Sequence, residues 1–152
     1  MSTKGTLKRE LERLAIHVND SVKGYEKAAE RVQDEDANLA LSFREIESSR
    51  RERADALNSR LKCIGEDEME RGSLEGSTHR ALISVKDMFT SSDNTKAVID
   101  EAIRGEEKLI DYINDTFDDV DAMDGETVRA INDLRTCVQQ ATQLLQAKAD
   151  AA

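Results

Sequence analysis

Residues 7–32 carry a seam position at every third or fourth residue, and this spacing most constrains the fold of the chain. The seam positions are Leu7, Leu11, Leu14, Val18, Ser21, Tyr25, Ala28 and Val32. Since one helical turn takes 3.6 residues, side chains at this spacing lie along one side of a helix. Steps that alternate between four and three are typical of a helix packed lengthwise on others. The pattern predicts a long helix over about residues 4–33.

The same periodicity predicts three more long helices, at about 37–63, 94–117 and 125–148, and a shorter one at 74–89. The seams of the three long helices contain Leu39, Phe43, Ile46, Ala54, Leu57 and Leu61, then Ile99, Ile103, Glu106, Ile110, Ile113 and Phe117, then Thr127, Ile131, Leu134, Val138, Ala141 and Leu145. The chain has no proline and only 3% aromatic residues, a composition that favours helix over strand.

Short polar breaks separate the predicted helices, and Asp36, Asp93 and Asp124 are candidate N-caps. Gly65 is expected to end the second helix, so that residues 63–73 are irregular. The 152 residues are therefore expected to form one all-α domain, a four-helix bundle over residues 1–152. A short helix at 74–89 in the crossover would carry the chain back and make the second and third long helices parallel, as in ferritin-like bundles.

The charge of the chain limits its partners. The formal net charge of −10 repels phosphate backbones and anionic lipid, so nucleic-acid and membrane binding are not expected. No apolar run approaches the roughly 20 residues of a membrane span, and the N-terminus is not a secretory signal. We therefore expect a cytoplasmic protein, with Cys63 and Cys137 as reduced thiols.

Four stretches of the chain resemble a known family. They are VKGYEKAAE (22–30), REIESSRRERADAL (44–57), GSLEGSTHRALISVKDMF (72–89) and VIDEAIRGEEKLIDYI (98–113). Together they resemble an uncharacterised bacterial family of the ferritin-like superfamily, a domain of unknown function. The resemblance implies a four-helix bundle and no established activity. Some members carry a histidine in the last helix, whereas VQQATQLL (138–145) has none, which weakens an inherited metal site.

Two charged residues interrupt the apolar faces. Arg50 falls near the centre of the face of the second helix, and Glu106 falls on the seam of the third. Each lies about 12 or 13 residues into its helix, close to the bundle midplane. Because an isolated buried charge costs several kcal/mol, we hypothesise a buried Arg50–Glu106 pair joined by Tyr25 or Ser21. The alternative is that one or both side chains reach solvent at a loose interface.

A metal site is the competing interpretation of Glu106. Together with Glu26 and Glu47 at the margins of their apolar faces, it gives weak candidate ligands for iron or manganese. A dinuclear site in such a bundle uses Glu-x-x-His on two helices, and this motif does not occur in the chain. His17 and His79 are the only histidines. No catalytic residue and no resident cofactor are therefore expected.

The glycine before Glu106 admits two readings. A glycine inside a helix costs up to about 1 kcal/mol relative to alanine, so Gly105 marks either a close backbone approach or an ordinary surface position.

The sequence thus favours a non-enzymatic bundle that acts by self-association or protein binding. The resemblance implies a stress-related role, and a metal-binding carboxylate bundle is the alternative function. Long bundles often pair side by side, which makes a homodimer a state to test. The apolar stripe from Leu74 to Phe89 is a further candidate surface for a protein partner unless the bundle itself covers it.

Overall fold

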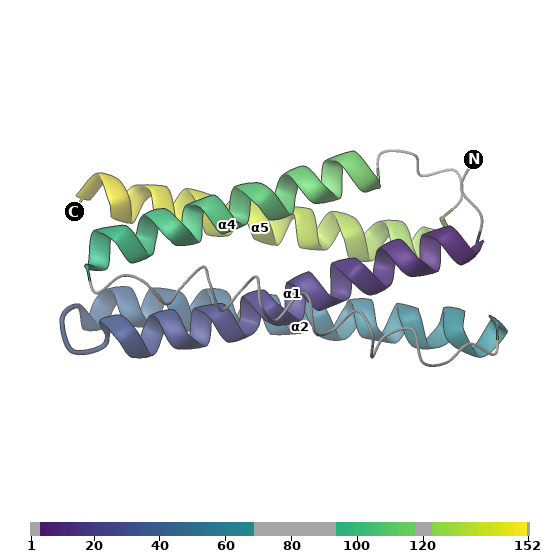
Figure 1. The fold of residues 1–152 in the computed structure, drawn as a ribbon, viewed down its shortest axis with the longest axis horizontal. Coiled ribbons are helices and arrows are strands. Elements are labelled where there is room, and N and C mark those ends of the chain that lie inside the picture. Colours follow the sequence, from purple (N-terminus) through teal and green to yellow (C-terminus); the bar gives the residue numbers. More distant parts are fainter. Residues whose placement is uncertain (1–3, 69–93, 118–122, 152) are drawn as a thin grey trace.

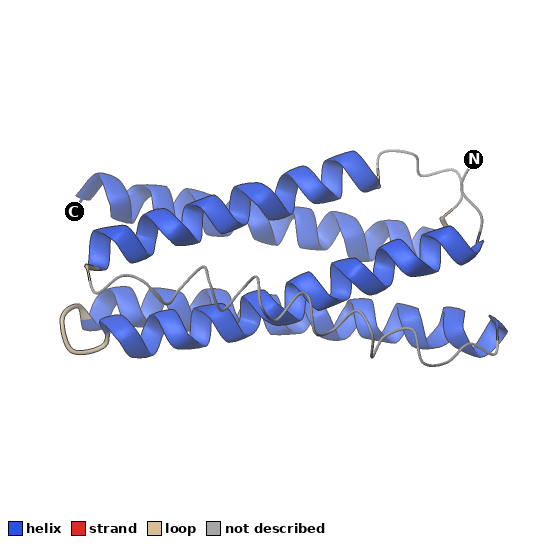
Figure 2. Cartoon of the chain, viewed as in Figure 1, coloured by secondary structure: helices blue, strands red, loops and turns tan. Residues whose placement is uncertain are grey.

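A computed structural model describes residues 4–68, 94–117 and 123–151 of the chain. These residues form helices α1 (Lys4–Val32), α2 (Ala37–Glu68), α4 (Thr95–Thr116) and α5 (Gly125–Ala151). Figure 2 shows helices joined by loops and no strand within the described ranges. The prediction of an all-helical chain with four long helices is confirmed for these residues. The predicted short helix at 74–89 lies outside them.

The four helices lie lengthwise in two antiparallel pairs, α1 with α2 and α4 with α5 (Figure 1). The pairs meet where α2 contacts α5 and where α1 contacts α4. Helices α2 and α4 run in the same direction and lie on a diagonal of the bundle (Figure 1). Among the described residues these two helices make no backbone-level contact. Any interaction between α2 and α4 must therefore be made by side chains that meet at the centre of the bundle.

The core is divided along its length into two apolar clusters, which the predicted seams supply in large part. In α4 the buried face is shifted by one residue from the prediction, because Ile103 and Ile110 are only half-buried. The buried positions there are Val98, Ala102 and Leu109. The first cluster contains residues between Leu11 and Val18, Ala54 and Leu61, Leu109 and Phe117, and Ala130 and Val138. The second contains residues between Tyr25 and Val32, Leu39 and Ile46, Val98 and Ala102, and Ala141 and Leu145. Each helix contributes to both clusters. The division between them falls at the midplane of the bundle.

Side-chain caps fix the first turns of three helices. Asp36 accepts a hydrogen bond from the backbone N–H of Leu39 at 3.0 Å, and Asp124 accepts one from Thr127 at 2.7 Å. Both predicted caps are confirmed. The cap of α4 is Asn94, whose side chain accepts from the N–H of Lys96 at 2.8 Å. The prediction of Asp93 was therefore one residue early, because Asn94 supplies the same oxygen acceptor; Asp93 itself lies outside the described residues.

The end of α2 differs from the prediction. The helix does not stop at Gly65 but continues to Glu68, so residues 63–68 are helical rather than irregular. Ile64, half-buried, packs against the first apolar cluster next to Leu61. This packing offsets the cost of about 1 kcal/mol for a glycine inside a helix. The other long helices agree with their predicted bounds to within three residues.

None of the helices in the described ranges is long and apolar enough to cross a lipid bilayer.

Candidate functional site

A layer of polar side chains separates the two apolar clusters, and we call Ser21, Arg50 and Glu106 the central polar layer. Ser21 comes from α1, Arg50 from α2 and Glu106 from α4. Arg50 is fully buried and Glu106 is only 2% exposed. Both lie where the helical period turns each helix toward the core, so apolar residues flank them one turn away on each side. Among the described residues, Arg50 is the most deeply buried charged side chain.

The structure brings Arg50 and Glu106 together across the diagonal of the bundle. Nη1 of Arg50 donates to Oε2 of Glu106 at 3.1 Å, and Nη2 donates to Oε1. Nη1 also donates to the hydroxyl of Ser21 at 2.9 Å. The guanidinium fork thus engages both carboxylate oxygens, a bidentate geometry that lysine cannot reproduce. Three helices are joined through one side chain.

Tyr25 lies directly beside this pair. The Cζ atom of Arg50 lies 5.6 Å from the centre of the tyrosine ring, within the range of a cation–π contact. Burial raises the pKa of Tyr25 well above its ordinary value, and the negative charge and hydrogen bonding of Glu106 raise it further. The phenol therefore stays protonated.

The opposite charges of Arg50 and Glu106 stabilise each other in the core. Burial alone would lower the pKa of Arg50, but the adjacent Glu106 carboxylate raises it above the ordinary arginine value. Such a pair adds little net stability compared with apolar residues of the same size. It does penalise any arrangement that leaves one charge alone in the core. The layer therefore specifies which residues of α2 and α4 face each other.

A second polar feature lies between α2 and α5, and sequence reasoning missed it. The thiol of Cys137 lies 3.4 Å from the hydroxyl of Ser49. Both residues line a surface cleft of about 260 Å³ whose other walls are Glu45, Ile46, Gln140, Ala141 and Leu144. Cys137 follows Leu134 by three and precedes Ala141 by four, so the helical period contained a signal for its burial. The cleft itself depends on the spacing between helices, which periodicity does not encode.

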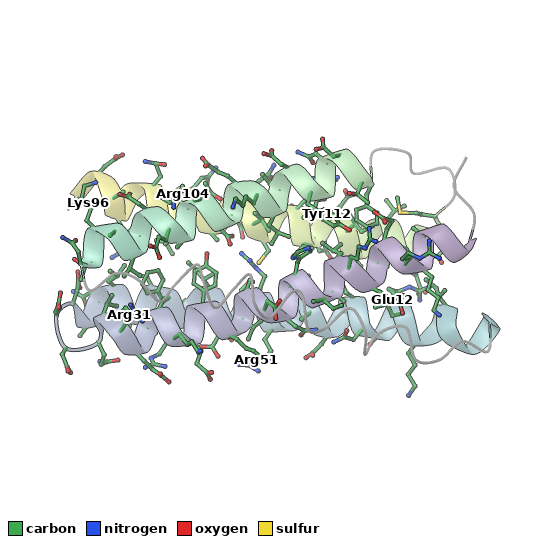
Figure 3. The ribbon with its side chains drawn as sticks, in the orientation of Figure 1. Glu12, Arg31, Arg51, Lys96, Arg104 and Tyr112 are labelled. Atoms are coloured by element: carbon green, nitrogen blue, oxygen red, sulfur yellow. The ribbon has the colours of Figure 1, made fainter. Side chains whose placement is uncertain are left out.

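The three carboxylates proposed as metal ligands do not converge. Glu26 is exposed on α1. Glu47 accepts a hydrogen bond at 2.6 Å from Arg51, which points outward from α2 (Figure 3). Over the ranges that the structure describes, no three His, Cys, Asp or Glu side chains are grouped so as to hold a metal ion. Glu106 is engaged by Arg50.

The histidines contribute to packing or lie outside the described part of the chain. His17 is exposed on α1, and its ring contacts that of Tyr112 edge-on at 5.3 Å between centroids. Tyr112 points from α4 toward α1 (Figure 3), and its hydroxyl donates to the backbone oxygen of Glu10 at 3.4 Å. Burial raises the pKa of Tyr112 to about 12. These contacts join α1 to α4. His79 lies outside the described residues.

Comparison with known proteins places most of the chain within one family. A family model described as "Domain of unknown function (DUF2383)" matches residues 7–119. The match includes every residue of the central polar layer and ends before α5, which supplies one wall of the cleft. No curated protein and no solved structure matches the chain.

Proposed function

The chain belongs to the DUF2383 family, a domain family of unknown function, and from its own residues we propose that it is a non-enzymatic helical bundle. In this proposal the bundle acts by binding protein through its outer surface, with a second copy of itself as the first partner. The core serves as a rigid scaffold.

The observation that carries the proposal is the engagement of Glu106. Both of its carboxylate oxygens accept hydrogen bonds from Arg50, and the pair is sealed between two apolar clusters. A carboxylate that serves as a metal ligand or general base must present a lone pair to a metal or a substrate. Here the arginine fork occupies that position. The buried polar layer is therefore best understood as structural, and binding is assigned to the surface.

The surface offers one apolar feature suited to binding. Leu41 on α2 is 60% exposed, and the cleft lined by Ile46, Ala141 and Leu144 begins one turn further along the helix. Single exposed leucines are common on proteins. An exposed leucine next to an apolar cleft, on a chain whose charge otherwise keeps it soluble, is a better candidate for a contact.

The proposal also includes a ferritin-like bundle type, a cytoplasmic location and a stress-related role. Support for the bundle type comes from the resemblance of residues 72–89 and 98–113 to a bacterial ferritin-like family, and from the common direction of α2 and α4 (Figure 1). The cytoplasmic location is supported by the two free thiols, Cys63 and Cys137, because disulfides are rare in that compartment. The role is supported only by the resemblance.

Two measurements on the untagged full-length chain test the proposal. Sedimentation velocity at micromolar concentrations is expected to show a dimer in reversible exchange with monomer. Elemental analysis of the same sample is expected to show no stoichiometric metal. Stoichiometric iron or manganese would replace the proposal with the alternative, a metal-binding carboxylate bundle. A monomer at every accessible concentration would overturn self-association.

A further inference from the structure

The outer side of α1 carries a line of buried residues that point away from the core. Glu12, Ile16, Asp20 and Gly24, which we call the outer line, follow each other at steps of four and are all buried. At about 100° per residue, Ile16 and Asp20 each lie about 160° around α1 from the core residue Val18. The side of a helix that points away from its bundle is normally in water. Because these residues are buried within a single copy, the chain itself covers the outer line.

The neighbouring helices do not supply this cover. Helix α4 approaches α1 at His17, whose ring contacts that of Tyr112, yet His17 remains exposed. Asp20 lies about 60° further around α1 from α4 and is nevertheless only 2% exposed. On the flank toward α2, Lys23 and Glu26 are exposed. The burial of the outer line is therefore not an extension of the contacts that α1 makes with α2 and α4.

The connection between α2 and α4 must cross the outside of the bundle. These two helices run in the same direction, so the chain leaves α2 at one end of the bundle and enters α4 at the other (Figure 1). Because α2 and α4 lie on a diagonal, residues 69–93 must pass over either α1 or α5.

The length of this connection keeps it close to the surface. Helix α2 has 32 residues and is about 48 Å long, which sets the distance to be covered. The predicted helix at 74–89 would rise about 24 Å, and the nine other residues of 69–93 would reach about 30 Å when extended. The connection therefore has little length to spare and must follow the bundle.

Exposure on α5 excludes the route over that helix. The residues of α5 that point away from the core are all exposed, namely Arg129, Asn132, Thr136 and Gln143. A segment that followed the outer side of α5 would bury residues at these positions. The outer side of α1 is buried instead.

The course of the outer line matches the path that the connection needs. Each step of four residues turns the line by about 40° around α1, from the flank toward α2 at Glu12 to the flank toward α4 at Gly24. Since α1 is antiparallel to α2, the same steps lead from the end of α2 toward the start of α4 (Figure 1). A segment lying on this line would thus cross α1 obliquely from one helix to the other.

We infer that residues 69–93 cover the outer line, with the apolar stripe from Leu74 to Phe89 turned toward α1. The chemistry of the line suits such a cover. Ile16 is apolar, Gly24 has no side chain to obstruct a close approach, and Oδ2 of Asp20 is buried without a hydrogen-bond partner among the described residues. A polar cover would offer Oδ2 a donor, whereas apolar side chains exclude water without replacing it.

This inference goes beyond the proposed function, because it assigns the apolar stripe to the fold. The stripe is then not a surface for a protein partner, and binding is confined to other parts of the bundle.

The test measures how fast N-ethylmaleimide labels single thiols in the full-length chain. Cys63→Ser and Cys137→Ala remove the native thiols, and Ile16→Cys places one on the outer line. Lys27→Cys is the matched exposed control, since it lies on the same side of α1 three turns further on. The thiol at position 16 is expected to react at least about tenfold more slowly than the thiol at position 27.

Substitution in the stripe identifies the cover. Leu82→Asp is expected to remove the difference between positions 16 and 27, because its carboxylate cannot be buried against α1. Gly76→Asp adds the same charge on the opposite side of the predicted helix and is expected to leave position 16 protected. A thiol placed in the core by Val18→Cys is expected to stay protected with either substitution, which verifies that the bundle remains folded.

Three results would overturn the inference. Equal labelling at positions 16 and 27 without a stripe substitution would show that the outer line is open. Protection of position 16 that survives Leu82→Asp would show that another segment covers it. Protection that disappears on dilution would assign the cover to a second copy of the chain.

Crosslinking decides the case in which Leu82→Asp also exposes the thiol at position 18, since the bundle has then unfolded. Ile16→Cys is combined in turn with Thr78→Cys, Ala81→Cys and Leu82→Cys and treated with a short bismaleimide. A crosslink within one copy from at least one pair is expected, and no crosslink from any pair would overturn the inference. The oligomeric state is measured separately, so the proposed self-association stands or falls independently.

Discussion

At the residue scale, the guanidinium of Arg50 joins three helices in the core. It is fully buried, yet it satisfies Glu106 and Ser21 with the two nitrogens at the end of its fork. Its Nε is buried without a hydrogen-bond partner among the described residues. The hydrogen bonds of Arg50 therefore stabilise the folded chain, while the burial of its unsatisfied Nε destabilises it. This balance predicts an unequal response to single and double substitution.

We expect Arg50→Met and Glu106→Leu each to lower the free energy of unfolding by about 3–5 kcal/mol, because each leaves one buried charge alone. The double variant is expected to lie within about 1 kcal/mol of wild type, or above it. Urea unfolding of all four proteins gives the double-mutant cycle. Arg51→Met is the matched control, since the Arg51–Glu47 pair is exposed and worth at most about 1 kcal/mol. Additive losses in the double variant would contradict a coupled pair.

Asp20 on α1 predicts a pH dependence of stability. It is 2% exposed, its Oδ2 has no hydrogen-bond partner among the described residues, and burial raises its pKa to about 6 against a partial offset from Lys23. Because the folded pKa exceeds that of the unfolded chain, this contribution to stability is complete below about pH 4 and is lost as pH rises through 6.

Asp20→Asn removes this titration. The variant is expected to be more stable than wild type by about 2 kcal/mol at pH 8 and about equal to it near pH 4. Urea unfolding at a series of pH values measures the difference. A difference that does not change with pH would show that Asp20 has the same pKa in the folded and the unfolded chain.

At the element scale, an N-cap and two ion pairs from Arg60 hold the start of α5 in place. Asp124 caps the helix, and Arg60 from α2 reaches Asp124 at 3.1 Å and Glu126 at 2.7 Å. The backbone hydrogen bond from Thr127 is the main reason that the pKa of Asp124 is lowered. The cap therefore contributes at neutral pH and fades as pH falls through its lowered pKa.

Asp124→Ala is expected to cost about 1 kcal/mol of unfolding free energy, the usual value for an N-cap. Glu126→Ala keeps the cap and loses only an exposed ion pair, so it is expected to cost less than about 0.5 kcal/mol. Thermal unfolding of the two variants at pH 7 compares them directly. Equal losses would assign the effect to the charge on Arg60 instead of to the cap.

The helices themselves could be predicted because apolar residues recur at the helical period along most of each one. The ends were less predictable, since a cap can be supplied by either of two adjacent residues, as at Asp93 and Asn94, and since Ile64 packs beyond Gly65. The contact of Arg50 with Glu106 could be anticipated because both break an apolar pattern at the same depth. Glu26 and Glu47 could not be placed, because a flexible side chain at the margin of an apolar face can turn to water.

At the scale of the whole molecule, charge and association oppose each other. Each copy carries a net charge of −10, so two copies repel at low ionic strength. The Debye length falls from about 30 Å at 0.01 M salt to about 10 Å at 0.1 M, and the repulsion between whole molecules falls with it.

The proposed dimer is therefore expected to tighten several-fold between 20 and 300 mM sodium chloride, because salt screens the repulsion between the two acidic copies. Sedimentation equilibrium at three salt concentrations measures this. Weakening with salt would indicate that attraction between opposite charges dominates the association.

The gap between α2 and α5 that forms the cleft could not be predicted, because it depends on how four side-chain surfaces fit together.

The diagonal contact between α2 and α4 has a consequence for sequence variation. The apolar positions of the two clusters can exchange one aliphatic residue for another at modest cost, provided that volume is kept. Positions 50 and 106 have no such freedom individually, because either change alone leaves a lone charge in the core. Among relatives that share this bundle, the two positions should therefore covary, as arginine with glutamate or as two apolar residues. They would do so although their helices do not touch through the backbone.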